Sequence, residues 1–303
     1  MDEYGLKLNF GQTTYDEWRS KGTGLLIEEL LLAVGNSDTS TGRLTFSLPH
    51  RDALLPDLSV FAALKERVCI GGVQCVLLYR TNEGILKMPL SVRSAKTGDN
   101  AGLVQTLPRG FHQPLESNMR FANWSACKQL SQTLARELFE ELLGGERLVG
   151  QPSQSFISDV LLPKLVKFIT THTRAWLTAL SFAMEDGNYQ LTVVIEIPNH
   201  AEFTDAAVQL RRQIAAGQPH NTNFVTDLGK GWLDDKNWIT NWEAQDENVS
   251  TVPFVEENIL AYLGDYNPEK PHWIHGSILA LAEAAFFARE MDWLPAGLPI
   301  KRG

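Results

Sequence analysis

Apolar residues along this chain follow two periods, one typical of helices and one typical of strands. Helical spacing and closing turn residues predict helices at residues 25–34, 62–67, 125–143, 156–171, 206–216, 255–263 and 274–291. Runs with strand character predict strands at residues 43–48, 68–80, 85–93, 103–107, 175–184 and 189–197. Both kinds of element are therefore mixed along the whole chain.

Two local signals refine this pattern. Asp186-Gly187 lies at the centre of the turn between the last two predicted strands, which predicts a hairpin. Pro163 lies inside the predicted helix 156–171, and it either bends that helix or begins a second segment, because proline removes a backbone donor.

Strands before and after a central helix, with further helices on either side, predict an α/β fold: an α/β/α sandwich around a mixed sheet. Residues 1–60 are predicted to form an N-terminal extension, because so short a segment builds a poor core of its own. Residues 61–303 are predicted to form one domain with extra C-terminal helices.

Charge limits the partners that this chain can take. Its 27 Lys and Arg against 36 Asp and Glu give a formal net charge of -9, so it has no global basic field for extended nucleic acid. A small phosphorylated ligand stays possible, since a divalent cation can supply positive charge locally.

Cysteine usage and the N-terminus favour a cytoplasmic protein. Cys69, Cys75 and Cys127 form neither a disulfide framework nor a close pair of metal ligands, and Cys69 and Cys75 are expected to be buried thiols on one side of a strand. Residues 1–10 lack the apolar stretch of a secretion signal, and no run approaches the length of a membrane helix, so no membrane partner is expected.

The chemistry is concentrated on the predicted helix 125–143. Glu137, Glu140 and Glu141 are spaced so that they share one helical face, while leucines every four residues beside that face anchor the helix to a core. Clustered carboxylates repel one another unless a cation neutralises them, and oxygen ligands favour Mg²⁺ or Mn²⁺. A solvated acidic helix face is the alternative, and doublets such as Glu256-Glu257 show how common it is.

The segment before this helix changes the interpretation. An extended run leads into Arg109-Gly110, and Glu116 follows six residues after that glycine. Here the sequence resembles the Nudix hydrolase superfamily, whose signature joins a Gly and a Glu to Arg-Glu, two further residues and Glu-Glu. Gly110 and Glu116 match the first half, and the run from Arg136 to Glu141 matches the second.

The match departs from the family pattern in two places. Nineteen residues, 117–135, separate the two halves instead of the family's seven, and the closing glycine falls one position late, at Gly144. In this the chain resembles longer bacterial Nudix-like proteins with an expanded box. The resemblance covers residues 68–290 and implies a Nudix-like α/β/α sandwich.

The resemblance also implies roles. Glu140 and Glu141 would ligate a Mg²⁺ or Mn²⁺ cofactor, and Glu137 would ligate metal or act as the base toward water. A backbone carbonyl near Arg109 or Gly110 would complete the shell. Arg136 would orient the carboxylates, for instance by pairing with Glu116; on spacing alone it is equally a surface partner for Glu140.

Other candidates are weaker. His112 follows Gly110 closely and is expected to be an exposed loop histidine rather than a phosphate ligand. A distal acidic ligand is expected among Glu185, Asp186, Glu256 and Glu257, with nothing to choose between them. Trp232, Trp238 and Trp242 are expected to cover the core, the alternative being a stacking surface for a nucleobase.

Three functions follow from these observations. The first is a metal-dependent pyrophosphohydrolase that cleaves a nucleoside diphosphate linked to another moiety, with a small nucleotide-like ligand as its partner. The second is a catalytically weak or inactive Nudix-fold nucleotide sensor or protein-interaction module. The third is a component of a homo-oligomer or larger assembly, which depends on the apolar helix 274–291 being exposed.

Overall fold

A computed structural model describes most of the predicted elements. The described residues are 13–21, 24–35, 47–57, 68, 70–93, 102–112, 126–143, 161–182, 188–216, 249–264 and 272–294. The predicted helix 62–67, most of the predicted strand 43–48, Glu116, Glu185, Asp186 and the three tryptophans at 232, 238 and 242 lie outside these ranges.

The chain divides into two units. One consists of Met1–Gly72, Arg120–Asn123 and Leu180–Gln190, and the other of Val73–Met119, Trp124–Ala179 and Leu191–Gly303. The predicted division into an extension over residues 1–60 and a domain over residues 61–303 stays a prediction.

The first unit contains three described helices, α1 (Tyr15–Lys21), α2 (Gly24–Gly35) and α3 (Pro49–Leu54). Helix α2 confirms the helix predicted at residues 25–34, whereas α1 and α3 were not predicted. The Glu29 carboxylate accepts hydrogen bonds from the backbone N–H groups of His50 and Arg51, at 2.8 and 2.9 Å. These bonds hold the first turn of α3, whose N–H groups have no partner within the helix.

The described strands form one seven-stranded sheet. They are β1 (Gly71–Arg80), β2 (Leu86–Val92), β3 (Val104–Thr106), β4 (Arg109–Phe111), β5 (Arg174–Phe182), β6 (Tyr189–Ile197) and β7 (Val249–Pro253). The order is β3-β2-β1-β6-β5, with β4 also paired to β1 and β7 to β2. The predicted α/β fold with a mixed sheet is confirmed.

Most strand predictions are confirmed within a few residues, but two strands were missed. Residues 109–111 form β4, and residues 249–253 form β7. Both are short, and both are defined by pairing with strands that are distant in sequence. The Cys75 N–H donates to the Pro108 carbonyl at 2.9 Å and the Leu77 N–H to the Leu107 carbonyl at 3.2 Å, which fixes the entry into β4.

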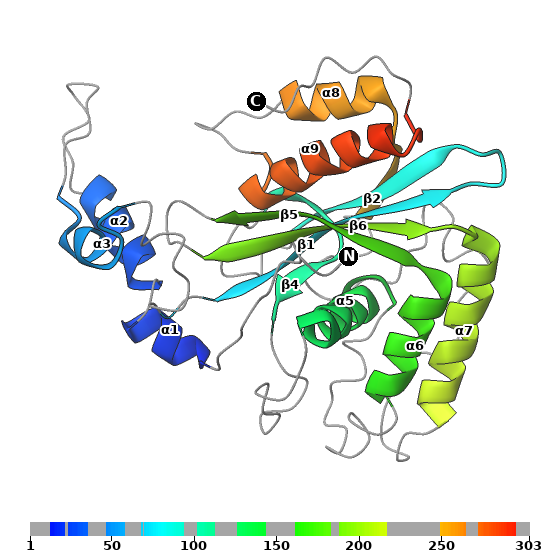
Figure 1. The fold of residues 1–303 in the computed structure, drawn as a ribbon, viewed down its shortest axis with the longest axis horizontal. Helices are drawn as coiled ribbons and strands as arrows, with labels where there is room; N and C mark the ends of the chain where they lie inside the picture. Colours follow the sequence, from blue (N-terminus) through cyan, green and yellow to red (C-terminus); the bar gives the residue numbers. More distant parts are fainter. Residues whose placement is uncertain are drawn as a thin grey trace, which may run out of the picture. The chain divides into compact units, whose positions relative to one another are not determined.

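Helices cover both faces of the sheet in the second unit. Helices α8 (Glu256–Gly264) and α9 (His275–Glu290) lie on one face, and α5 (Ala126–Leu142), α6 (Leu162–His172) and α7 (His200–Ala216) lie on the other (Figure 1). Pro163 is in the first turn of α6, where a missing N–H costs nothing.

Alternation along β1 separates the two faces. Val76 and Leu78 belong to a buried apolar cluster that includes Leu281 and Ala284 of α9. Tyr79 points to the other face, where its ring stacks on His200 of α7 with centroids 4.7 Å apart. Because side chains alternate along a strand, Cys75 and Leu77 share the face of Tyr79.

Helix α9 is built into the core. Its buried residues are Ser277, Ala280, Leu281, Ala284, Ala285 and Ala288. This confirms the predicted burial for one face of the helix, while Leu279 on the same helix is 38% exposed. The assembly hypothesis stays a prediction. Within the described ranges, no helix has the length and apolar character needed to cross a bilayer.

Candidate functional site

The candidate site lies where α5 packs beside β4. Gly110, in the middle of β4, lies so close to α5 that a Cβ added there would overlap the carboxylate of Glu137. Glycine is therefore required at this position by close approach of backbone to side chain. This contact brings Gly110, from the first half of the matched signature, to Glu137 of the second half.

A second carboxylate fixes the start of β4. The backbone N–H of Arg109 donates to Oε2 of Glu141 at 2.8 Å, and the Glu141 residue is only 3% exposed. Glu137 and Glu141 are one helical turn apart on α5, so both lie against the Arg109–Gly110 backbone.

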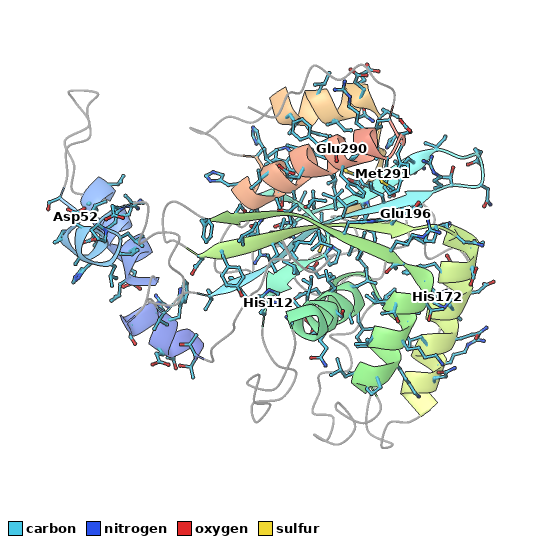
Figure 2. The ribbon with its side chains drawn as sticks, viewed as in Figure 1. Asp52, His112, His172, Glu196, Glu290 and Met291 are labelled. Atoms are coloured by element: carbon cyan, nitrogen blue, oxygen red, sulfur yellow. The ribbon has the colours of Figure 1, made fainter. Side chains whose placement is uncertain are left out.

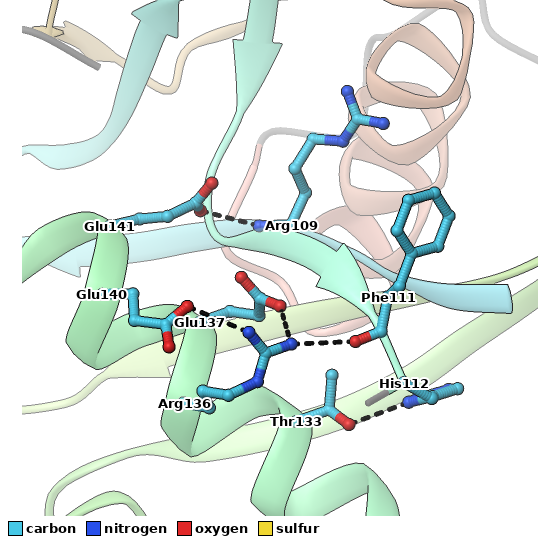
Figure 3. A network of polar contacts seen from close by, with 8 residues as sticks. All are labelled: Arg109, Phe111, His112, Thr133, Arg136, Glu137, Glu140 and Glu141. Atoms are coloured by element: carbon cyan, nitrogen blue, oxygen red, sulfur yellow. Dashed lines mark hydrogen bonds and ion pairs between the residues drawn. The ribbon is translucent and has the colours of Figure 1, made fainter. Parts of the chain in front are cut away.

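Arg136 ties the carboxylates of α5 to β4. Its guanidinium donates to Oε2 of Glu140 at 2.9 Å, to the Phe111 carbonyl at 2.9 Å and to the Glu137 carboxylate (Figure 3). The side chain is 6% exposed. Arg136 therefore pairs with Glu140 one turn away, as its spacing predicted, but it does so in the interior and not as a surface partner.

The site concentrates negative charge in a buried place. Glu137, Glu140 and Glu141 carry three formal negative charges, and Arg136 carries one positive charge. The neighbouring thiol of Cys75 is affected by this charge. Burial raises the pKa of Cys75 well above the ordinary value, and the charges of Glu141 and Glu137 raise it further. Cys75 is thus a neutral buried thiol, in agreement with its prediction.

His112 differs from its prediction as an exposed loop histidine. It is half-buried at the end of β4, and its Nδ1 lies 2.9 Å from Oγ1 of Thr133 on α5. Burial, together with the smaller effect of the nearby charge of Arg136, lowers the pKa of His112 from 6.5 to about 4. A neutral ring explains why His112 can lie beside a guanidinium.

Sequence reasoning missed Thr133 and the Phe111 carbonyl. Thr133 is one turn before Glu137, so helical spacing alone places it on the carboxylate face. The carbonyl of Phe111 carried no signal, because its position depends on β4 being a strand.

Whether a divalent cation fits here depends on the donors present. Within the described ranges, no three His, Cys, Asp or Glu side chains are clustered closely enough to hold a metal. Glu137 and Glu141 nevertheless offer two buried carboxylates that lie one helical turn apart on α5. Gly110 has no side chain, so no Cβ overlaps the Glu137 carboxylate. Hard oxygen donors of this kind fit Mg²⁺ or Mn²⁺, with further oxygens completing the shell.

Glu140, the third predicted metal ligand, is oriented toward Arg136. Glu140 is more exposed than its neighbours, at 22% of its side chain, and its carboxylate faces Arg136. Of the four candidate distal acids, Glu256 and Glu257 lie in the first turn of α8, on the opposite face of the sheet from α5 (Figure 1). Glu116, Glu185 and Asp186 lie outside the described ranges.

No protein-family model matches this chain, and neither does any curated protein. Solved structures similar to it include a NUDIX hydrolase from Alicyclobacillus acidocaldarius, at 12% identity and a TM-score of 0.37, covering 74% of this chain and 96% of the other. The Nudix hydrolase RenU from M. Smegmatis is similar at 10% identity and a TM-score of 0.32, with 74% and 91% covered.

A C. elegans Ap4A hydrolase, solved as a binary complex, is similar at 10% identity and a TM-score of 0.32, covering 73% of this chain and 99% of the other. Likenesses at these identities and scores do not establish membership of a family.

Proposed function

We propose that this chain is a divalent-metal-dependent pyrophosphohydrolase of Nudix type, which cleaves a nucleoside diphosphate linked to another moiety. The observation that carries the proposal is the arrangement of Glu137 and Glu141, buried one turn apart on α5 against the Arg109–Gly110 backbone of β4. Both carboxylates are buried, which excludes a solvated acidic face for them, and oxygen donors clustered in this way favour a divalent cation.

Glu137 and Glu141 would hold the cation, joined by Glu140 if it leaves Arg136, and by oxygens from the Arg109–Gly110 backbone and Glu116. When bound, Mg²⁺ or Mn²⁺ neutralises diphosphate oxygens and makes a water molecule more acidic. The nucleotide-like substrate is acidic like the protein, so the cation also supplies the attraction that a net charge of -9 does not.

The residues of the chain orient this chemistry. Arg136 holds the carboxylates of Glu137 and Glu140 and is itself fixed to β4 through the Phe111 carbonyl. Glu137 either ligates the metal or takes the proton of the attacking water. Gly110 leaves the Glu137 carboxylate room at the strand, so helix and strand stay in register at the reacting centre.

The test is hydrolysis of a panel of dinucleotides, nucleotide sugars and nucleoside triphosphates with Mg²⁺ or Mn²⁺. Wild type is compared with the double variant Glu140→Gln plus Glu141→Gln, and with Glu290→Gln as a matched control, because Glu290 is an exposed carboxylate at the end of α9. Figure 2 shows Glu290 on the other side of the sheet from His112.

Turnover that requires metal, disappears in the double variant and persists in Glu290→Gln is the expected result. Nucleotide binding that requires metal and Glu141, without any turnover, would favour the sensor or interaction module instead. Turnover that survives the double variant would contradict the proposed site.

A further inference from the structure

Two buried polar side chains form a cross-strand pair on β2 and β3. Ser91 and Gln105 are directly opposite each other, and each is 1% exposed. Leu90, the neighbour of Ser91, belongs to the apolar cluster under α9. Because successive side chains alternate, Ser91 and Gln105 point to the opposite face of the sheet, the face on which α5 lies.

Polar atoms of this pair have no hydrogen-bond partner. Neither Oγ of Ser91 nor Nε2 of Gln105 is bonded, and the same holds for Oγ1 of Thr251 on β7. Thr251 is opposite Pro89, two residues before Ser91, so it shares their face. Buried polar atoms without partners destabilise a fold and are rare, so three on one stretch of sheet indicate that a ligand supplies the partners.

The contact of Arg93 sets the direction of the Gln105 amide. Nη1 of Arg93 donates to Oε1 of Gln105 at 3.4 Å, so the oxygen is engaged and the two N–H groups of Nε2 remain as donors. Ser91 offers a hydroxyl that donates or accepts. Directly opposite residues have Cβ atoms about 5 Å apart, so the pair presents neutral donors side by side.

The pair is close along the chain to the carboxylate site. Gln105 precedes Arg109, whose N–H holds Glu141, by four residues, and four residues of extended chain span at most about 14 Å. Both groups also lie on the same face of the sheet. One nucleotide-sized ligand can therefore contact the carboxylate site and the pair together.

We propose that Ser91 and Gln105 determine specificity by binding the base of a nucleoside diphosphate. This inference rests on the proposed function, which places the diphosphate at Glu137 and Glu141. A nucleobase edge presents the ring nitrogen and carbonyl acceptors that neutral amide and hydroxyl donors match. Neither residue carries a charge, so their unbonded polar atoms match the neutral edge of a base.

The test is calorimetric titration of the full chain with ADP, UDP and pyrophosphate in the presence of Mg²⁺, together with thermal unfolding. The variants are Gln105→Leu and Ser91→Ala, which remove the donors without adding bulk. Thr192→Val is the matched control, because Oγ1 of Thr192 is also buried and unbonded but lies on the α9 face, two residues before Val194.

Gln105→Leu and Ser91→Ala are expected to weaken binding of ADP or UDP at least ten-fold and leave pyrophosphate affinity unchanged. Ser91→Ala should not lower the unfolding temperature of the free protein, since it removes only an unbonded polar atom. Gln105→Leu also removes the Oε1 acceptor of Arg93, so its unfolding temperature should fall slightly while its pyrophosphate affinity stays unchanged. Thr192→Val should match wild type in every affinity. A purely structural role would change stability and leave the affinities alone.

Equal nucleotide affinity in wild type and both variants would overturn the inference, as would a wild type that binds neither ADP nor UDP. Glu141-dependent hydrolysis with Gln105-independent binding would overturn this inference and leave the proposed function standing. Gln105-dependent nucleotide binding without any hydrolysis would overturn the proposed hydrolysis and leave the assignment of Ser91 and Gln105 to the base standing.

Discussion

The two faces of the sheet are both covered by helices but are built from different chemistry. Under α9, the contacts are apolar, with Leu281 and Ala284 packed on Val76 and Leu78. Under α5, buried carboxylates and Arg136 lie among leucines such as Leu138. Apolar contacts stabilise a fold without direction, whereas a buried ion network depends on each partner. The comparison suggests that the α9 face provides stability and the α5 face provides chemistry.

Removing Arg136 should break the α5 face most severely. Arg136→Met leaves the carboxylates of Glu137 and Glu140 without their shared guanidinium, which should lower the free energy of unfolding by about 3–5 kcal/mol in metal-free buffer. Added Mg²⁺ should recover part of this loss, since a bound ion stabilises the folded state. Denaturant unfolding measures both effects.

Arg174→Met is the control for that change. Arg174 pairs with Glu196 at 3.5 Å, but its side chain is 65% exposed, so the loss should stay below about 1 kcal/mol. Similar losses in the two variants would contradict the view that Arg136 neutralises a buried network.

Leu281→Ala should affect the α9 face alone. The side chain is fully buried, so truncation should lower the free energy of unfolding by about 2–5 kcal/mol. The kcat and KM of the folded variant should equal those of wild type. Leu279, on the same helix and 38% exposed, is the control, and Leu279→Ala should change stability much less. A changed KM in Leu281→Ala would contradict the view that the α9 face provides stability and the α5 face provides chemistry.

Gly110→Ala should affect the α5 face, and therefore the activity. The added methyl displaces the Glu137 carboxylate, and a misplacement of this kind should lower kcat about 100-fold, equivalent to about 2.7 kcal/mol. A Cβ at Gly264 meets open space, so Gly264→Ala should keep full activity. Steady-state kinetics measure kcat for both variants. Full activity of Gly110→Ala would mean that the contact between Gly110 and the Glu137 carboxylate plays no part in the reaction.

His112 should give the smallest effect. Its pKa is lowered to about 4 in the folded protein from an ordinary 6.5, so between these values the unfolded chain binds more protons than the folded one. Stability contributed by the neutral ring is complete above about pH 6.5 and is lost as the pH falls toward 4. Arg136 and Thr133 are the partners that face this ring from α5.

His112→Gln should therefore lose less stability than wild type over that interval, by on the order of 1 kcal/mol given the part-exposed ring. Unfolding free energies of both proteins at pH 7, 5.5 and 4.5 test this. Parallel curves would show that another group causes the acid sensitivity.

Periodicity predicted the elements that carry their own signal. Helix α5 was predicted within one residue at each end, because leucines and carboxylates repeat with helical spacing. Helix α7 begins at His200, six residues before the prediction, and β4 and β7 were missed. A three-residue strand carries too little pattern of its own, and its existence depends on partners more than 30 residues away, such as Cys75 for Pro108.

Spacing also placed the carboxylates on one face of a helix, but it did not predict their surroundings. The pairing of Arg136 with Glu140 has the same spacing on a surface and in a core, so burial was not readable from it. The Arg109 N–H at Glu141, the Phe111 carbonyl at Arg136 and the neutral His112 all depend on where β4 lies. Predictions based on spacing therefore found the residues and the Arg136–Glu140 pair, and missed the contacts with β4.

The central claim is that the buried carboxylates of α5 hold a divalent cation, and Mn²⁺ binding tests it most directly. Electron paramagnetic resonance titration would compare wild type, Glu137→Gln, Glu141→Gln and Glu290→Gln, with circular dichroism as the check on folding. The predicted result is one specific site in wild type and Glu290→Gln, and at least ten-fold weaker binding in the other two. Equal Mn²⁺ affinity in all four folded proteins would contradict the claim.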